Sequence, residues 1–415
     1  MRIAIIGSGI SGLTCAYLLA RQHQITVFEA DNRIGGHTHT VDVDWQGRRY
    51  GVDTGFIVYN DWTYPNFIRL LDQLGVASRP TEMSFSVHDP ASGQEYKGHT
   101  LGSLFARRRN LLSPGFWGML RDILRFNREA TADFQAQRID TTTRLGDYLR
   151  DRRYGQRFID HYIVPMGSAI WSMSPAGMLE FPLQFFVRFC HNHGLLSVNQ
   201  RPQWRVLEGG SRAYIEPLCA RFRQRIHLDC PVQRVSRDTD GVTVHSRRGP
   251  ERFDKVIFAC HSDQALALLD TPSVDEVDVL GALAYAHNEV LLHTDTRLLP
   301  QRQKAWASWN YRLGGPPQAP AALTYNMNIL QGFDAPVTFC VSLNQGESVD
   351  PAKVLARFDY AHPQYSLAGI AAQARQNDLQ GQQHSYFCGA YWANGFHEDG
   401  VVSALTVAEH FGEAL

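Results

Sequence analysis

The chain opens with MRIAIIGSGISGLTCAYLLARQHQITVFEADNRIGG, residues 1–36, and this stretch decides the fold. Residues 2–6 form a short apolar run with β-branched side chains, which predicts a buried strand. Apolar residues at helical spacing predict a helix over 11–21, and QITVF at 24–28 predicts a second strand. Strand, helix and strand in this order predict an α/β domain built on a parallel sheet.

Three glycines lie in the turn between the first strand and the helix. Gly7 permits the tight turn, Gly9 leaves room for a pyrophosphate against the backbone, and Gly12 lets the helix pack close to the strand. Ser11 lies in the first turn of the helix, whose free N–H groups suit phosphate. Glu29 ends the second strand 17 residues after Gly12, near the spacing of a carboxylate that binds an adenosine ribose. The pattern predicts a Rossmann-like dinucleotide-binding domain.

A second glycine pair follows Glu29 directly, in the order Arg33, Ile34, Gly35, Gly36 and His37. Here the chain resembles the flavin-containing amine oxidase superfamily, which also holds phytoene desaturases and protoporphyrinogen oxidase. Its fingerprint continues from the glycine turn and the ribose acid to R-x-G-G and an Arg, and this sequence has His37 at that last position. A histidine there gives a weaker, pH-dependent phosphate contact. The resemblance implies non-covalently bound FAD. The implied cofactor contacts in this region are Gly7, Gly9, Ser11, Gly12, Glu29, Arg33, Gly35, Gly36 and His37.

Composition excludes several classes of protein. The 415 residues allow two domains, and a net charge of −1 with pI about 7.0 argues against a nucleic-acid binder. Seven scattered cysteines without a C-x-x-C, and a start that enters a strand directly, lead us to expect a cytoplasmic protein with reduced thiols. No apolar run approaches about 18 residues, so no membrane span is predicted. His191 and His193 beside Cys190 lack a second ligand cluster, so no metal site is predicted.

The resemblance extends over the chain and implies its domain organisation. The expected FAD-binding domain is Rossmann-like, of the glutathione-reductase type, and the expected substrate domain is discontinuous and α+β. The FAD-binding domain is expected to comprise residues 1–60, 204–262 and 381–415. The substrate domain is expected to comprise residues 61–203 and 263–380.

Two later segments are implied to contact the flavin. In the resembled superfamily a small residue lies under the flavin ring, and Gly55 fits that role. Phe56 and Tyr59 would reach the ring or the substrate, with ordinary core packing left open as the alternative. Val232 falls where the superfamily places a backbone contact to adenine. The closing motif over 386–404 has a strand ending in a glycine and a helix whose first turn faces the flavin pyrimidine edge. Its implied contacts are Gly389, Asp399, Gly400 and Val401.

Candidate catalytic residues come from the same motif. Tyr391, Trp392, Phe396 and His397 lie where amine oxidases place an aromatic cage, with Trp392 and Phe396 expected to contact substrate. His397 is the candidate proton acceptor, and a hydrogen-bonded structural histidine is the alternative. Lys304 is the candidate for the lysine that holds a water near flavin N5. Hydride transfer to the flavin needs no protein nucleophile.

Two segments resemble one subgroup more closely: VDTGFIVYNDWTYPNFIRLLDQLGV at 52–76 and GAYWANGFHEDG at 389–400. This subgroup comprises flavoproteins linked to cyclopropane and furan fatty acid synthesis. It implies an FAD-dependent oxidoreductase that desaturates or isomerises an unsaturated fatty acyl chain. A flavin amine oxidase is the alternative, and a non-catalytic lipid-binding flavoprotein is the second alternative.

The segment from Ser103 to Arg128 is basic, aromatic and amphipathic. Such a segment suits a bilayer surface, and a helix that packs one face on the core is the competing interpretation. In the membrane interpretation its arginines meet anionic head groups, and three aromatic side chains enter the acyl boundary, at Phe116, Trp117 and Phe126. We therefore expect peripheral contact with the cytoplasmic face of a membrane. The sequence leaves the oligomeric state open.

Overall fold

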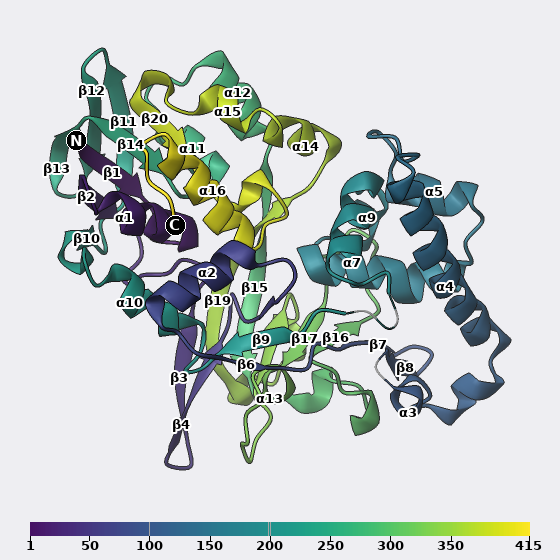
Figure 1. Cartoon of the computed structure of the whole chain (residues 1–415). Coiled ribbons are helices and arrows are strands. Elements are labelled where there is room, and N and C mark those ends of the chain that lie inside the picture. Colours follow the sequence, from purple (N-terminus) through teal and green to yellow (C-terminus); the bar gives the residue numbers. More distant parts are fainter. Residues whose placement is uncertain (99, 198, 200) are drawn as a thin grey trace.

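A five-stranded parallel sheet forms the centre of the upper-left lobe in Figure 1. The structure is a computed structural model and describes residues 1–98, 100–197, 199 and 201–415. Its strands, in spatial order, are β10 (Ile226–His227), β2 (Gln24–Phe28), β1 (Arg2–Ile6), β14 (Lys255–Phe258) and β20 (Ser385–Phe387). The strands come from three distant parts of the chain. The α/β fold expected from the glycine turn is confirmed.

Both faces of this sheet are covered, as the apolar sequence of β1 requires. Ile3 and Ile5 pack on one face with α1 (Ile10–Leu19), α10 (Ile215–Cys219) and α16 (His397–Glu409). Ala4 and Ile6 point to the other face. That face is covered by the antiparallel sheet of β11 (Val232–Asp238), β12 (Gly241–Ser246) and β13 (Gly249–Phe253), and by α11 (Ser262–Leu268) and α12 (Val274–Gly281).

A seven-stranded sheet forms most of the second lobe, and its two longest strands run between the lobes (Figure 1). In spatial order it contains β19 (Val354–Gln364), β15 (Ala284–His293), β18 (Cys340–Leu343), β17 (Leu323–Asn326), β16 (Trp309–Arg312), β7 (Phe85–Asp89) and β8 (Gln94–Lys97). β15 and β19 pair antiparallel from Ala284 with Gln364 to His293 with Val354. This ladder carries residues of the second lobe to the edge of the first.

Helices of the long insertion pack on β7, β8, β16 and β17 of the seven-stranded sheet, around one aromatic core. They are α3 (Leu101–Leu104), α4 (Pro114–Gln135), α5 (Leu145–Asp151), α6 (Gln156–Phe158), α7 (Val164–Trp171), α8 (Pro175–Leu179) and α9 (Leu183–Asn192). The predicted roles of Phe116 and Phe126 at a membrane are wrong, because both rings are fully buried in this core. Arg125 is likewise held against the protein, 3.9 Å above the centre of the Tyr154 ring.

The hairpin and the helix end that were predicted from turn residues are both present in the structure. The predicted hairpin is present as β3 (Thr40–Trp45) and β4 (Arg48–Asp53), and the predicted helix as α2 (Pro65–Leu74), which Gly75 ends in a left-handed conformation. The remaining elements are β5 (Tyr59–Asn60), β6 (Ser78–Pro80), β9 (Trp204–Leu207), α13 (Met327–Leu330), α14 (Leu367–Gln373) and α15 (Gln376–Leu379). β9 pairs with both β5 and β6, so the segment that returns the chain to the first lobe lies in a small sheet at the junction.

The buried carboxyl group of Asp53 connects three segments at this junction. It accepts hydrogen bonds from Thr40 Oγ1 at 2.6 Å, from the Ser211 backbone N–H at 2.9 Å and from Gln331 Nε2 at 2.7 Å. The Asp53 N–H in turn donates to Gln331 Oε1. Burial raises the pKa of Asp53 to about 6, so the surrounding donors are needed to keep a carboxylate there.

Replacing Asp53 by alanine should therefore lower stability markedly. We expect Asp53→Ala to cost about 3 kcal/mol, because three donors from three segments lose a buried acceptor. The matched control is Asp44→Ala on the same hairpin, where the carboxylate is exposed and pairs only with exposed Arg49. The control should change stability by less than about 1 kcal/mol. Thermal denaturation of the cofactor-loaded proteins measures both, and equal melting temperatures would contradict the role of Asp53.

Candidate functional site

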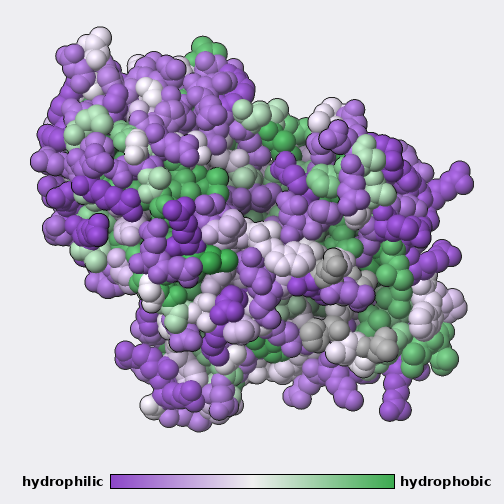
Figure 2. Space-filling model, in the orientation of Figure 1, coloured by the Kyte–Doolittle hydropathy of each residue, from purple (hydrophilic) through white to green (hydrophobic). Residues whose placement is uncertain are grey.

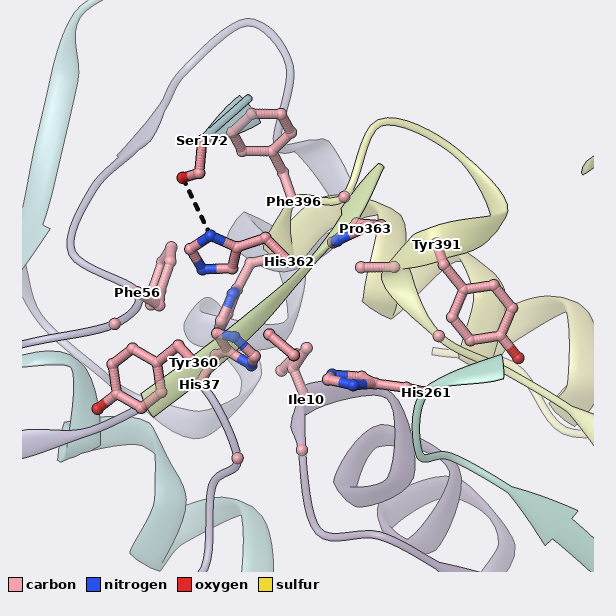
Figure 3. A pocket seen from close by; sticks show the side chains of 18 of the residues that line it. Ile10, His37, Phe56, Ser172, His261, Tyr360, His362, Pro363, Tyr391 and Phe396 are labelled. Atoms are coloured by element: carbon pink, nitrogen blue, oxygen red, sulfur yellow. Dashed lines mark hydrogen bonds between the residues drawn. The ribbon is translucent and has the colours of Figure 1, made fainter. Parts of the chain in front are cut away.

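A cavity of about 410 Å³ lies between the parallel sheet and the seven-stranded sheet, within the size range of ligand sites. One end is formed by the glycine turn and the segment 35–37, and the other by side chains of α7 and the seven-stranded sheet. Residues 54–58, 259–261, 360–363, 389–391 and 394–397 contribute to its walls (Figure 3). The cavity is thus long and is built by both lobes.

In the glycine turn, a side chain would have open space at Gly9 and none at Gly12. A Cβ atom on Gly12 would overlap the carbonyl oxygen of Gly7, so this glycine is needed for close packing of α1 on β1. A Cβ on Gly9 would meet no atom within 4 Å. A Cβ on Gly36, by contrast, would lie 3.1 Å from the Gly9 Cα. The two glycine segments therefore form a cradle at the N-terminus of α1, which fits the pyrophosphate of the expected FAD.

Glu29 lies at the end of β2 and lines the cavity. Its Oε2 accepts from the N–H of Ser8 at 2.8 Å and from the hydroxyl of Ser8 at 2.5 Å, which fixes the glycine turn. Arg33 does not line the cavity, contrary to the predicted cofactor contact. Its guanidinium instead donates to the carbonyls of Gly36 at 2.7 Å and Thr38 at 3.1 Å, so it acts by holding the second glycine segment.

Several other predicted cofactor contacts lie outside the cavity walls. Val232 begins β11 and packs with the core on the far face of the sheet. Gly400 and Val401 lie within α16, where a Cβ on Gly400 would come within 2.8 Å of the Ile10 side chain. Asp399 accepts from the N–H of Phe396 at 2.9 Å and caps α16, and burial raises its pKa to about 6. Gly400 thus lets the first turn of α16 pack against the first turn of α1, and Ser11 and Gly389 beside this contact line the cavity.

His397 is held as a structural histidine. Its ring stacks on Phe56 with centroids 3.5 Å apart, and its Nε2 lies 3.0 Å from Thr38 Oγ1 and 3.2 Å from the Tyr214 hydroxyl. Burial lowers the pKa of His397 well below its usual value, so it is a weak proton acceptor. The alternative of a hydrogen-bonded histidine fits the structure better than the predicted catalytic role. Phe56 itself lines the cavity, as does Gly55, whose Cβ position is blocked by the His37 carbonyl.

Three predicted substrate or catalytic residues lie away from the cavity. Tyr59 is buried in the core and donates to Ser78 Oγ at 2.6 Å. Trp392 is buried beside Tyr391 and donates to the Phe387 carbonyl at 3.1 Å. Lys304 is exposed in a short 3₁₀ turn and takes no part in the walls.

Tyr391 and Phe396 do line the cavity, and both are labelled in Figure 3. The Tyr391 hydroxyl is buried without a hydrogen-bond partner in the described part of the chain. Phe396 stacks on Phe189 with centroids 5.1 Å apart and also lines a second, more polar pocket beside Trp62 and Glu398. With Trp392 turned into the core, the expected aromatic cage of paired side chains is absent from this segment as described.

Sequence reasoning missed the residues that other elements bring to the cavity. His261 follows β14, and its place at the carboxyl end of a parallel strand was an available signal. Tyr360 and His362 come from β19, and Trp171 and Trp309 from α7 and β16. No spacing in the sequence identifies these four, because the pairing of distant strands brings three of them to the site and the packing of α7 brings Trp171.

The glycine turn gives a direct test of cofactor binding. Gly9→Val should leave the fold intact, since the space around Gly9 is open, but its side chain would occupy the pyrophosphate position and lower FAD affinity at least about 100-fold. Gly12→Val should instead destabilise the fold through its overlap with Gly7. Circular dichroism measures folding, and fluorescence titration measures FAD affinity. Unchanged FAD binding by a folded Gly9→Val protein would contradict this placement.

Comparison with known proteins agrees with this geometry. The family model for flavin containing amine oxidoreductase matches residues 10–324. AofH of Mycobacterium tuberculosis, named for flavin-containing monoamine oxidase activity, is 26% identical over 286 residues, which cover 67% of this chain and 61% of that protein. The flavin-containing amine oxidase A of Canis lupus familiaris is 25% identical over 264 residues, covering 59% and 46%. The chain thus matches less than two thirds of the length of these relatives.

Solved structures show the same fold over the whole chain. Cyclohexylamine oxidase from Brevibacterium oxydans has a TM-score of 0.69 at 15% identity and covers 99% of both chains. A fatty acid isomerase from P. acnes that produces CLA has a TM-score of 0.72 at 14% identity, covering 99% of this chain and 98% of that one. With the glycine turn, the second glycine segment and the closing helix in place, the chain belongs to the flavin-containing amine oxidoreductase family, whose cofactor is FAD.

Proposed function

We propose that this protein is an FAD-dependent oxidoreductase that desaturates or isomerises an unsaturated fatty acyl chain. The observation that carries the proposal is the apolar wall of the cavity at its substrate end, formed by Ile57, Val58, Ile170, Trp171, Val290, Trp309, Tyr325, Leu330 and Leu343. Among the described residues that line the cavity, Glu29 is the one carboxylate, and it lies at the glycine turn. Such walls favour a neutral hydrocarbon over a cation.

A few polar atoms interrupt this wall. The indole N–H groups of Trp171 and Trp309 and the hydroxyl of Tyr365 are buried, with no hydrogen-bond partner in the described part of the chain. Ser172 Oγ lies 3.0 Å from Nδ1 of His362, whose ring lies between this wall and His37 at the glycine cradle. Bound FAD supplies a hydride acceptor at N5. The protein walls then hold the chain straight beside it and exclude water.

The competing function is oxidation of an amine. The family and its relatives include amine oxidases, and the same fold occurs in the fatty acid isomerase, so the likeness alone supports both. An ammonium group is stabilised by a carboxylate or by the faces of aromatic rings. The substrate end has no carboxylate among its described residues, and Trp392 is turned into the core. The rings of Trp171, Trp309 and Tyr325 at this end suit either substrate, so the missing carboxylate is the feature that favours the acyl chain.

Substrate chemistry is tested by mixing the FAD-loaded protein, without oxygen, with a phospholipid that carries a cis-unsaturated chain and, separately, with primary amines. We expect the acyl chain to change, either with bleaching of the flavin absorbance for a desaturase or without net bleaching for an isomerase. Mass spectrometry with double-bond localisation identifies the product in both cases. Bleaching by amines together with an unchanged acyl chain would contradict the proposal.

A carboxylate introduced into the apolar wall should impair use of the acyl substrate without affecting FAD binding. We expect Ile170→Glu to lower kcat/KM for the acyl substrate by at least about tenfold, because a carboxylate beside hydrocarbon is poorly solvated. The matched control is Ile370→Glu, at a partly buried position of the same core that does not line the cavity. Both proteins should retain FAD. Equal losses in the two variants would contradict a wall at Ile170.

We further propose that the exposed face at the start of α4 delivers the substrate from an anionic membrane. Figure 2 shows apolar atoms gathered at the lower right, over the segment that leads from α3 to α4. The exposed apolar side chains there are Leu111, Leu112, Trp117 and Leu124, of which Leu112 is 87% exposed. Exposed arginines surround them, at Arg108, Arg109 and Arg121. No helix in the described part of the chain is long and apolar enough to span a bilayer, so contact would be peripheral.

Liposome flotation tests this face. Leu112→Ser with Leu124→Ser should reduce binding to anionic vesicles at least about tenfold, because two exposed apolar side chains lose their burial in the acyl boundary. Charge reversal of Arg108, Arg109 and Arg121 should also reduce binding, and so should added salt. The matched control is Val274→Ser with Val277→Ser, two exposed apolar residues on α12. Equal flotation of all variants, or none by the unmodified protein, would contradict membrane delivery here.

A further inference from the structure

A cluster of three histidines lies beside the glycine cradle and lines the cavity (Figure 3). His37 directly follows Gly36, which packs on Gly9. His261 lies two residues after Ala259. The carbonyl oxygen of Ala259 lies 2.7 Å from the position that a Cβ on Gly7 would take. The ring centroid of His37 lies 6.0 Å from that of His261 and 5.5 Å from that of His362. His37 thus lies next to the glycine cradle, where the cofactor's negative charge is expected, and the rings of His261 and His362 lie beside His37.

Within this cluster, His37 has a ring nitrogen without a partner. Nε2 of His37 is enclosed and makes no hydrogen bond to any described residue. The ring also bonds to the backbone of Ala361 in a way that raises its pKa, so the partner is the carbonyl oxygen. A neutral ring therefore donates from Nδ1 and leaves a lone pair on Nε2. A lone pair repels a phosphate oxygen, so the residue needs a second proton to stabilise the anion.

The charges that face His37 explain why it is neutral without the cofactor. Burial is the main cause that lowers its pKa to about 4, followed by the nearby His261 and then Arg33. His362 and the Tyr360 ring face it from β19, at 5.5 Å and 5.3 Å, and from α16 the buried His397 lies near enough for His37 to lower its pKa. Among the described residues that line the cavity, Glu29 is the one carboxylate, and it already accepts a hydrogen bond from Ser8.

The flanking groups reinforce this neutral state. Burial also lowers the pKa of His261 to about 4 and that of His362 to about 3, with neighbouring histidines as the next cause. His287 faces His261, and Asp31 pairs with Arg33 at 3.3 Å. Two adjacent protonated imidazoles would repel each other, so a charge on one ring lowers the pKa of the others further.

We propose that binding of FAD is coupled to the uptake of one proton by His37, which then serves the pyrophosphate in place of a permanently charged arginine. His261 and His362 remain neutral when His37 becomes charged. The coupling makes formation of the holoprotein depend on pH, independently of which substrate the protein uses.

The sign of the coupling follows from the two states of the site. Without FAD the pKa of His37 is about 4, and a pyrophosphate beside the ring raises it. Between these two values, binding takes up a proton, so FAD affinity rises as the pH falls. One proton gives at most about a tenfold change in Kd per pH unit. Above the raised pKa, affinity becomes independent of pH.

Isothermal titration calorimetry of the FAD-free protein with FAD measures this proton directly, when the titration is repeated in buffers of different ionisation enthalpy. Between about pH 6 and about pH 8 we expect net proton uptake by the unmodified protein and a Kd that falls at lower pH. His37→Gln should lose both effects. His37→Arg should also lose both, while binding at the higher pH at least as tightly as the unmodified protein. His261→Gln should retain uptake, because it removes only a neighbour.

Two controls keep the result interpretable. His245→Gln removes a histidine on β12 that does not line the cavity, and its proton uptake should equal that of the unmodified protein. Circular dichroism checks that each variant is folded. If His37→Gln fails to fold, the proton uptake of His37→Arg tests the same prediction. Absence of proton uptake by the unmodified protein, or undiminished uptake by folded His37→Gln or His37→Arg, would overturn the proposal.

Discussion

The close packing of α1 on β1 is the constraint on which the rest of the structure depends. Gly12 lies so close to the Gly7 carbonyl that a side chain there is impossible, and this contact sets where the helix begins. The same contact leaves Gly9 facing open space at the helix N-terminus. Gly36, the end of β14 and the first turn of α16 then pack around that point. A site for a long anionic cofactor results from backbone geometry alone.

The substrate end is built differently, from side chains on a long antiparallel ladder. β15 and β19 carry Tyr360 and His362 from the second lobe to the edge of the parallel sheet. Helix α7 adds Trp171 from the opposite direction, and β16 adds Trp309. Both lobes therefore contribute to one cavity, which joins the glycine cradle to an apolar end. This division places charge at one end and apolar surface at the other.

Sequence reasoning succeeded where the signal is local. The glycine turn, Glu29 and the hairpin that ends at Asp53 are each encoded within a few neighbouring residues, so spacing alone places them. Tyr59 and Trp392 were misplaced because an aromatic residue in a short strand or turn has no period that tells which face it occupies. The exposed position of Lys304 likewise follows from tertiary structure.

The central claim is that one cavity holds FAD at the glycine cradle and an unsaturated acyl chain at the apolar end. A crystal structure of the FAD-loaded protein soaked with a cis-unsaturated fatty acid tests it most directly. The account predicts the pyrophosphate against Gly9 and the chain between Trp171 and Trp309, with its double bond beside the flavin. An acyl chain bound only at the outer surface, with the apolar end empty or filled by an amine from a parallel soak, would contradict it.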